Sequence, residues 1–133
     1  MALKRGYKQL IADATARVHT MSVAEAQAKL GDPDTVFVDI RESGELEREG
    51  TVPGAFHAAR GMLEFWVDPE SPYYKQTLGP DKHLILYCAS AWRSALATAT
   101  LLDMGLTSVS QIEGGFSAWK KAGAPVEAWQ KKA

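Results

Sequence analysis

Residues 84–102 read LILYCASAWRSALATATLL. The first four of them form a short apolar run that is typical of a buried strand. From Ala95 onward, apolar residues recur every three or four positions, which is the spacing of one buried helix face. Cys88 therefore lies at a turn from a strand into a helix. This arrangement predicts both the class of fold and a candidate site.

Cys88 is the only cysteine in the chain. The first amides of a helix have no partner within the helix and its macrodipole is positive there, so the position favours an anion such as a thiolate. Arg93 adds a permanent cation whose planar fork fits the oxygens of a sulfonate, sulfate or phosphate group. A free cysteine is more often a buried apolar residue. The strand-to-helix position nevertheless favours a nucleophile held in an anion cradle.

The composition limits the choice of partners. The chain has 133 residues, of which 46% are hydrophobic and 23% charged, with a formal net charge of −1. These values fit one globular domain, and the scattered charges favour neither a nucleic acid nor an anionic membrane as a partner. No apolar run is long enough to span a bilayer, and the N-terminus lacks the hydrophobic core of a signal peptide. We therefore expect a cytoplasmic protein without a membrane partner.

Metal and cofactor sites are not expected either. One cysteine forms no internal disulfide and excludes an ordinary zinc site built on several thiolates. The three histidines, His19, His57 and His83, are widely spaced, so we expect structural or surface roles for them. The sequence thus predicts no metal and no cofactor.

Strand and helix patterns alternate along the chain. A capping box at Ser22 and Glu25 begins one helix, and apolar or β-branched runs indicate strands at 35–40, directly after the turn at 52–56, at 84–87 and at 108–112. Helical segments are predicted near residues 7–18, 22–30, 42–50, 61–66, 92–104 and 116–121. The alternation predicts a three-layer α/β domain with a mostly parallel sheet, in which sites gather at the carboxyl ends of the strands.

Two further segments lead to expectations about surfaces. The amphipathic stripe over residues 7–18 predicts packing on the domain or on a second copy of the chain, which would give a homodimer. We therefore divide the chain into an N-terminal helical extension, residues 1–20, and a domain, residues 21–133. The glutamates of the charged segment are interpreted as a solvated face; they are Glu42, Glu45, Glu47 and Glu49.

Four segments occur in the order found in the rhodanese-like family of sulfurtransferases, which the chain resembles from about Met21 to Trp129. They are VDIRE at 38–42, VPGA at 52–55, CASAWRS at 88–94, and IEGGFSAW at 112–119 followed by Pro125 and Val126. The resemblance implies a rhodanese fold, with a mostly parallel five-stranded sheet flanked by helices. It also implies that Cys88 is catalytic and carries a persulfide.

The activity implied by the resemblance is that of a thiosulfate sulfurtransferase. The Cys88 thiolate attacks the outer sulfur of a small sulfur-containing anion, sulfite leaves from thiosulfate, and a thiol, cyanide or protein acceptor then takes the sulfur. The loop implied to bind the donor consists of Ala89, Ser90, Ala91, Trp92, Arg93 and Ser94. The alternative is a relay or regulatory module that takes persulfide from a partner protein.

A phosphatase or arsenate reductase activity is a more distant alternative. Four residues separate Cys88 from Arg93, as in the sulfurtransferases that the chain resembles, whereas related phosphatases carry five. The shorter ring favours sulfur chemistry over a tetrahedral phosphate. With one fixed cation in the loop, we expect thiosulfate to be held weakly.

The remaining expectations concern departures from the family and supporting residues. Ala91 replaces a common glycine, so a positive φ there would cost about 1 kcal/mol. Trp92 is expected either to stack on an acceptor or to anchor the loop. Asp39 and Arg41 match a charged pair that supports the sheet, and Arg60 is either a second anion contact or a solvated side chain.

Overall fold

The computed structural model describes residues 2–131 of the chain, in which helices and strands alternate. The helices are α1 (Tyr7–Arg17), α2 (Val23–Gln27), α3 (Ser43–Glu49), α4 (Leu63–Val67), α5 (Trp92–Asp103) and α6 (Gly115–Lys121), with short 3-10 turns at Arg60–Met62 and Gln76–Leu78. The strands are β1 (His19–Met21), β2 (Thr35–Asp39), β3 (Phe56–His57), β4 (His83–Tyr87) and β5 (Val109–Ile112).

The five strands form one sheet in the order β1-β5-β4-β2-β3. All neighbouring strands run parallel, so the prediction of a mostly parallel five-stranded sheet is confirmed. Strand β4 is central, between β5 and β2. Because parallel strands end at the same edge of a sheet, Cys88 lies at the middle of that edge.

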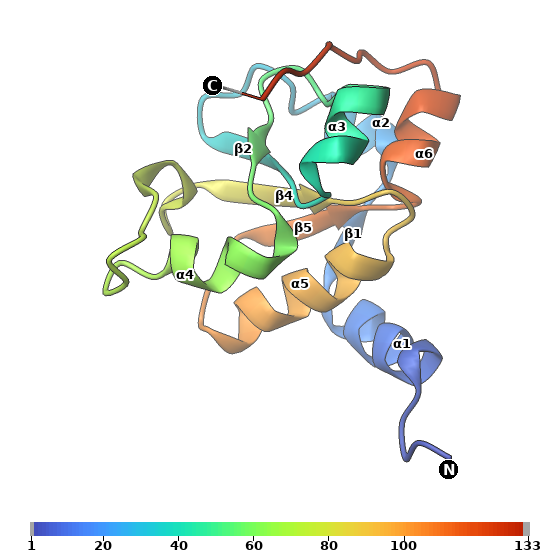
Figure 1. Ribbon diagram of the computed structural model, residues 1–133, viewed down its shortest axis with the longest axis vertical. Coiled ribbons are helices and arrows are strands. Elements are labelled where there is room, and N and C mark those ends of the chain that lie inside the picture. The colour runs from blue at the N-terminus through green and yellow to red at the C-terminus, as the bar shows by residue number, and fades with distance from the viewer. Residues whose placement is uncertain (1, 132–133) are drawn as a thin grey trace.

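Helices cover both faces of the sheet, which confirms the three-layer architecture (Figure 1). Helices α1, α4 and α5 lie on one side, and α2, α3 and α6 lie on the other. Strand β4 shows why both faces are covered, because its side chains are apolar in both directions. Leu84 and Leu86 belong to the core cluster that includes α5, and Ile85 and Tyr87 belong to the cluster that includes α6.

The capping box predicted at the start of α2 is present. The Ser22 hydroxyl accepts a hydrogen bond from the Glu25 amide at 3.1 Å, and the Ser22 amide donates to the Glu25 carboxylate at 2.9 Å. The helix ends at Gln27, three residues earlier than the sequence pattern predicts. The reciprocal pair is local in sequence, which is why it could be predicted.

Strand β1 was not predicted from the sequence. Its three residues, His19–Met21, pair with Ser110–Ile112 of β5, and only Met21 is buried. So short a strand carries no alternating pattern, and its conformation is set by its neighbour in the sheet. Residues 19 and 20, which were assigned to the helical extension, therefore belong to the sheet.

Helix α1 packs on α5 of the same chain. Ala14 and Val18 form a buried cluster with Ala95 and Ala99, and the Arg17 guanidinium pairs with the Asp103 carboxylate. Ala14 and Val18 of the predicted apolar stripe are thus buried within the chain, whereas Leu10 is 38% exposed. No helix in residues 2–131 is long and apolar enough to cross a membrane.

Candidate active site

Cys88 follows the last residue of β4 and is only 1% exposed. Its sulfur accepts a hydrogen bond from the Ser94 amide, with 3.4 Å between nitrogen and sulfur. Ser94 is the third residue of α5, and the helix receives no side-chain cap from Ala91. The sulfur therefore takes the place of the N-cap acceptor and lies at the positive end of the helix.

The loop between Cys88 and α5 presents free backbone donors. In the part of the chain that the structure describes, the amides of residues 89–93 donate to no other protein group. Ala91 has φ 69° and is the only described residue other than glycine with a positive φ. An alanine thus adopts here the left-handed conformation that glycine adopts most readily. The free amides form a cradle suited to an anion.

The base of this loop is held by the turn that begins α6. The Phe116 amide donates to the Cys88 carbonyl at 2.8 Å, and the Ser117 amide donates to the Ala89 carbonyl at 3.0 Å. Gly115, the residue before Phe116, has φ +62°, and a Cβ there would come within 2.5 Å of the Cys88 carbonyl oxygen. Only glycine allows this approach, which explains the Gly-Gly turn.

Arg93, expected to add a permanent cation at the rim of the loop, has a carboxylate partner in the structure. Its two terminal nitrogens donate to the two carboxylate oxygens of Glu45, both at 2.9 Å. The bidentate pair raises the pKa of Arg93 and, mainly through the same hydrogen bonds, lowers the pKa of Glu45 to about 2. The cation and the carboxylate therefore both remain charged across the ordinary pH range.

Glu45 is the site residue that the sequence analysis missed. Its side chain is 20% exposed, so it does not belong to a solvated face. It is the third residue of α3, and its carboxylate also accepts the Glu42 amide at 2.8 Å. The spacing of Glu42 and Glu45 is that of a capping box, which was the available signal for an anchored side chain.

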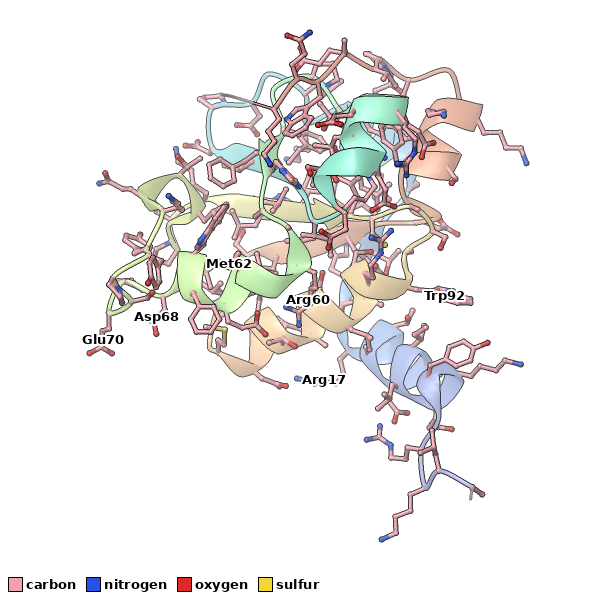
Figure 2. All side chains as sticks on the ribbon, in the orientation of Figure 1. Arg17, Arg60, Met62, Asp68, Glu70 and Trp92 are labelled. Atoms are coloured by element: carbon pink, nitrogen blue, oxygen red, sulfur yellow. The ribbon has the colours of Figure 1, made fainter. Side chains whose placement is uncertain are left out.

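Trp92 lies at the outer side of the loop, beside α1 (Figure 2). It is 53% exposed, and its ring centroid is 5.2 Å from that of Tyr7. A cavity of about 400 Å³ adjoins it, lined by Ile11, Thr15, Ser90, Gln111 and Glu113 among others. Trp92 therefore anchors the loop on α1, and about half of its side chain remains exposed to solvent.

Arg60 follows β3 and precedes α4. Its guanidinium donates to the Glu64 carboxylate at 2.7 Å, an ion pair one helical turn apart. Figure 2 shows Arg60 at the start of this helical segment. The arginine interpreted as either a second anion contact or a solvated side chain thus carries a carboxylate partner.

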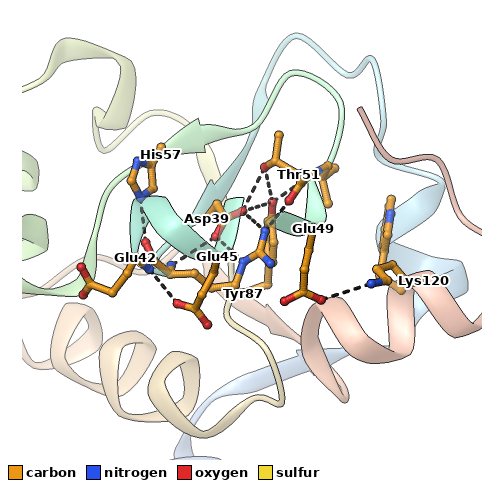
Figure 3. Close-up of polar contacts among 12 residues, drawn as sticks. Asp39, Glu42, Glu45, Glu49, Thr51, His57, Tyr87 and Lys120 are labelled. Atoms are coloured by element: carbon orange, nitrogen blue, oxygen red, sulfur yellow. Dashed lines mark hydrogen bonds and ion pairs between the residues drawn. The ribbon is translucent and has the colours of Figure 1, made fainter. Parts of the chain in front are cut away.

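Asp39 and Arg41 form a fully buried ion pair behind the site. The Arg41 guanidinium donates to Asp39 at 3.0 and 2.8 Å and to the Gly50 carbonyl at 2.7 Å, and it lies 4.1 Å from the centre of the Phe116 ring. The Tyr87 hydroxyl also donates to Asp39 at 2.7 Å (Figure 3). Burial is the main cause that raises the pKa of Tyr87. This polar cluster ties β2 to the end of β4, directly before Cys88.

The fold and the site together define a class: an α/β protein with a cysteine in an anion cradle at the end of its central parallel strand. Residues 22–122 match the family described as the Rhodanese-like domain. The chain therefore belongs to the rhodanese-like family.

The chain is similar to proteins of several descriptions. Thiosulfate sulfurtransferase 16, chloroplastic, of Arabidopsis thaliana is 46% identical over 98 residues, covering 69% of this chain and 79% of its own. A solved structure of a Rhodopseudomonas palustris protein of unknown function, described as a possible tyrosine phosphatase, is 49% identical with a TM-score of 0.91, covering 96% of this chain and 98% of its own. The polysulfide-sulfur transferase homodimer of Wolinella succinogenes is 28% identical with a TM-score of 0.70. The match covers 92% of this chain and 88% of the Wolinella succinogenes chain.

Proposed function

We propose that this protein is a sulfurtransferase that carries sulfane sulfur as a persulfide on Cys88. The observation that supports this most directly is the contact between the Cys88 sulfur and the Ser94 amide at the start of α5. Together with the free amides of residues 89–93, it provides stabilisation for an anion at the sulfur. The sulfurtransferase named among the relatives favours the same chemistry.

The cycle has two nucleophilic steps. The Cys88 thiolate attacks the outer sulfur of the donor, a new S–S bond forms, and the donor's own bond to that sulfur breaks, so that sulfite leaves thiosulfate with the electron pair. The nucleophile of a thiol, cyanide or protein acceptor then attacks the outer sulfur of the persulfide, and Cys88 leaves as a thiolate. Ala89, Ser90 and the rest of the loop amides stabilise the negative charge in both steps.

A relay module that receives its sulfur from a partner protein is the second candidate. It is favoured by the ion pairs at Arg93, Arg60 and Arg41, since each of these cations already has a carboxylate partner. A small dianion such as thiosulfate would gain little from them. The exposed Trp92 beside the loop gives a partner a surface to contact.

The test is the intact mass of the protein after incubation with thiosulfate and, separately, with methanethiosulfonate. Wild type is expected to gain one sulfur, about 32 Da, and to lose it to cyanide as thiocyanate. Cys88→Ser is expected to gain nothing and to keep nearly the same melting temperature. Absence of an adduct with every donor would refute the proposal.

Two controls separate the alternatives. A large fall in the melting temperature of Cys88→Ser would favour a purely structural, buried thiol. Hydrolysis of p-nitrophenyl phosphate that depends on Cys88 would favour a phosphatase, the activity suggested for the Rhodopseudomonas palustris protein. We expect no such hydrolysis, because only four residues separate Cys88 from Arg93.

A further inference from the structure

The carboxylate of Glu45 fills the guanidinium fork of Arg93. Both contacts between them measure 2.9 Å, and the Glu42 amide holds the same carboxylate at 2.8 Å. Three donors therefore fix Glu45 in place. A fork that is already occupied by two carboxylate oxygens is not available for the oxygens of a substrate.

The three arginines that the sequence resemblance assigned to the site or to its support are each paired with a carboxylate. Arg93 is paired with Glu45, Arg60 with Glu64, and Arg41 with Asp39. The favourable groups left for a bound anion are the backbone amides of residues 89–93 and the positive end of α5. The N-terminus of a helix acts as a positive charge of about half an elementary charge. This charge neutralises only a small part of the two negative charges of a dianion.

This balance determines which donors the site can hold. We infer that Glu45 makes the Cys88 site selective for sulfur donors that carry a single negative charge, such as thiosulfonates and persulfides, over dianions such as thiosulfate. The inference rests on the proposed sulfur transfer and specifies its donor class. Glu45 acts through the charge of Arg93 and touches no reacting atom.

The favoured reaction is balanced without any further reactant. The Cys88 thiolate attacks the terminal sulfur of methanethiosulfonate, the S–S bond to Cys88 forms, and the S–S bond of the donor breaks. Methanesulfinate leaves with the electron pair. The total charge is the same before and after, with one negative charge on the persulfide and one on the sulfinate.

The first test measures anion binding without sulfur transfer. Sulfate and methanesulfonate are tetrahedral anions of similar size that carry two charges and one charge. Binding of either anion in the loop is expected to protect Cys88 from iodoacetamide. In Glu45→Gln, which keeps the size and the acceptor oxygen of the side chain, methanesulfonate is expected to bind about threefold more tightly. Sulfate is expected to bind about tenfold more tightly, because electrostatic energy doubles with its charge.

The matched control is Glu49→Gln on the same helix. Glu49 lies one turn further along α3 and pairs with Lys120 at the surface (Figure 3), so the variant loses the same charge away from the loop. Both affinities are expected to stay within about 1.5-fold of wild type at constant ionic strength. Melting temperatures show whether each variant is folded.

The second test measures the same selectivity in turnover. The ratio of kcat/KM for thiosulfate to that for methanethiosulfonate is expected to rise about threefold in Glu45→Gln and to stay constant in Glu49→Gln. Equal changes for both anions or both donors would overturn the inference, because Glu45 would then only position Arg93. If the anions protect Cys88 as expected but no donor forms a persulfide, the charge selection is supported and sulfur transfer is refuted. If sulfur transfer occurs but the ratio of the two kcat/KM values is unchanged in Glu45→Gln, sulfur transfer is supported and the charge selection is refuted.

Discussion

The hydroxyl of Ser94 donates its proton to Oε1 of Gln111 at 2.7 Å. The oxygen of the same hydroxyl lies 3.6 Å from the Cys88 sulfur. The Gln111 amide nitrogen donates to Thr20 at 3.1 Å, which fixes the orientation of the amide. Because a hydroxyl carries a single proton, Ser94 offers the sulfur an acceptor and not a donor. Gln111 thus withholds one hydrogen bond from the thiolate.

Replacing Gln111 is expected to make Cys88 more reactive. In Gln111→Met the Ser94 hydroxyl is free to donate to the thiolate, and alkylation by iodoacetamide at pH 7 is expected to accelerate about fivefold. The rate is measured from intact mass against time. The double variant Gln111→Met with Ser94→Ala removes the donor and is expected to lose the acceleration. An unchanged or slower rate in Gln111→Met would contradict this account.

Gly115 is expected to be the least replaceable glycine of the site. Gly115→Ala combines a positive φ with a backbone clash against Cys88 and Ala89, and should cost about 3 kcal/mol or more in unfolding free energy. Gly123→Ala is the control, because Gly123 has φ +76° with nothing within 4 Å of the added Cβ. Its cost should be about 1–2 kcal/mol. Equal urea midpoints for the two variants would rule out the clash.

Ala91 should tolerate glycine better than any larger residue. Ala91→Gly relieves a left-handed conformation at φ 69° that costs about 1–2 kcal/mol, while the more flexible unfolded chain offsets about 0.4–1 kcal/mol of that gain. The expected result is a stability that is unchanged or about 1 kcal/mol higher. Ala91→Val should be clearly destabilised, because a β-branched residue fits this conformation poorly. A less stable glycine variant in urea unfolding would refute the argument.

Tyr87 tests the supporting role of the Asp39–Arg41 pair. Tyr87→Phe removes a donor to Asp39 and the acceptor for the Val52 amide at 3.1 Å, and should cost about 2–3 kcal/mol in unfolding free energy. Persulfide formation at 25 °C should change less than about twofold if the cluster supports the fold without taking part in the chemistry. Tyr73→Phe is a control at a side chain that is 61% exposed. Loss of activity with unchanged stability would assign the cluster a catalytic role.

His83 should make stability depend on pH. Burial first, and then repulsion by Lys29 and His19, lowers its pKa from the ordinary value of 6.5. The unfolded chain therefore binds the proton more readily, so the stabilisation is present above pH 6.5 and decreases as the pH falls below it. His83→Gln is expected to flatten this slope in urea titrations between pH 7.5 and 5. Parallel curves for the variant and wild type would show that another group is responsible.

Several parts of the fold and site could be predicted because their causes are local. The apolar run before Cys88, the helical spacing after it and the Ser22–Glu25 capping box each depend on residues within one or two turns of chain. The alternation of strand and helix patterns was enough to predict a three-layer domain with a parallel sheet. The short strand β1 carries no such pattern, since its hydrogen bonds to Ser110–Ile112 define it.

The place of the cysteine and the backbone groups around it follow from local sequence, because a strand, a turn and a helix follow one another along the chain. The balance of charges near the cysteine follows from how distant segments meet in the folded protein. Glu45 and Arg93 are 48 residues apart, and Ser94 and Gln111 are 17 apart. Their contacts depend on the order of the strands in the sheet, which brings the starts of α3 and α5 to the same edge after the neighbouring strands β2 and β4. Local propensity does not encode that order.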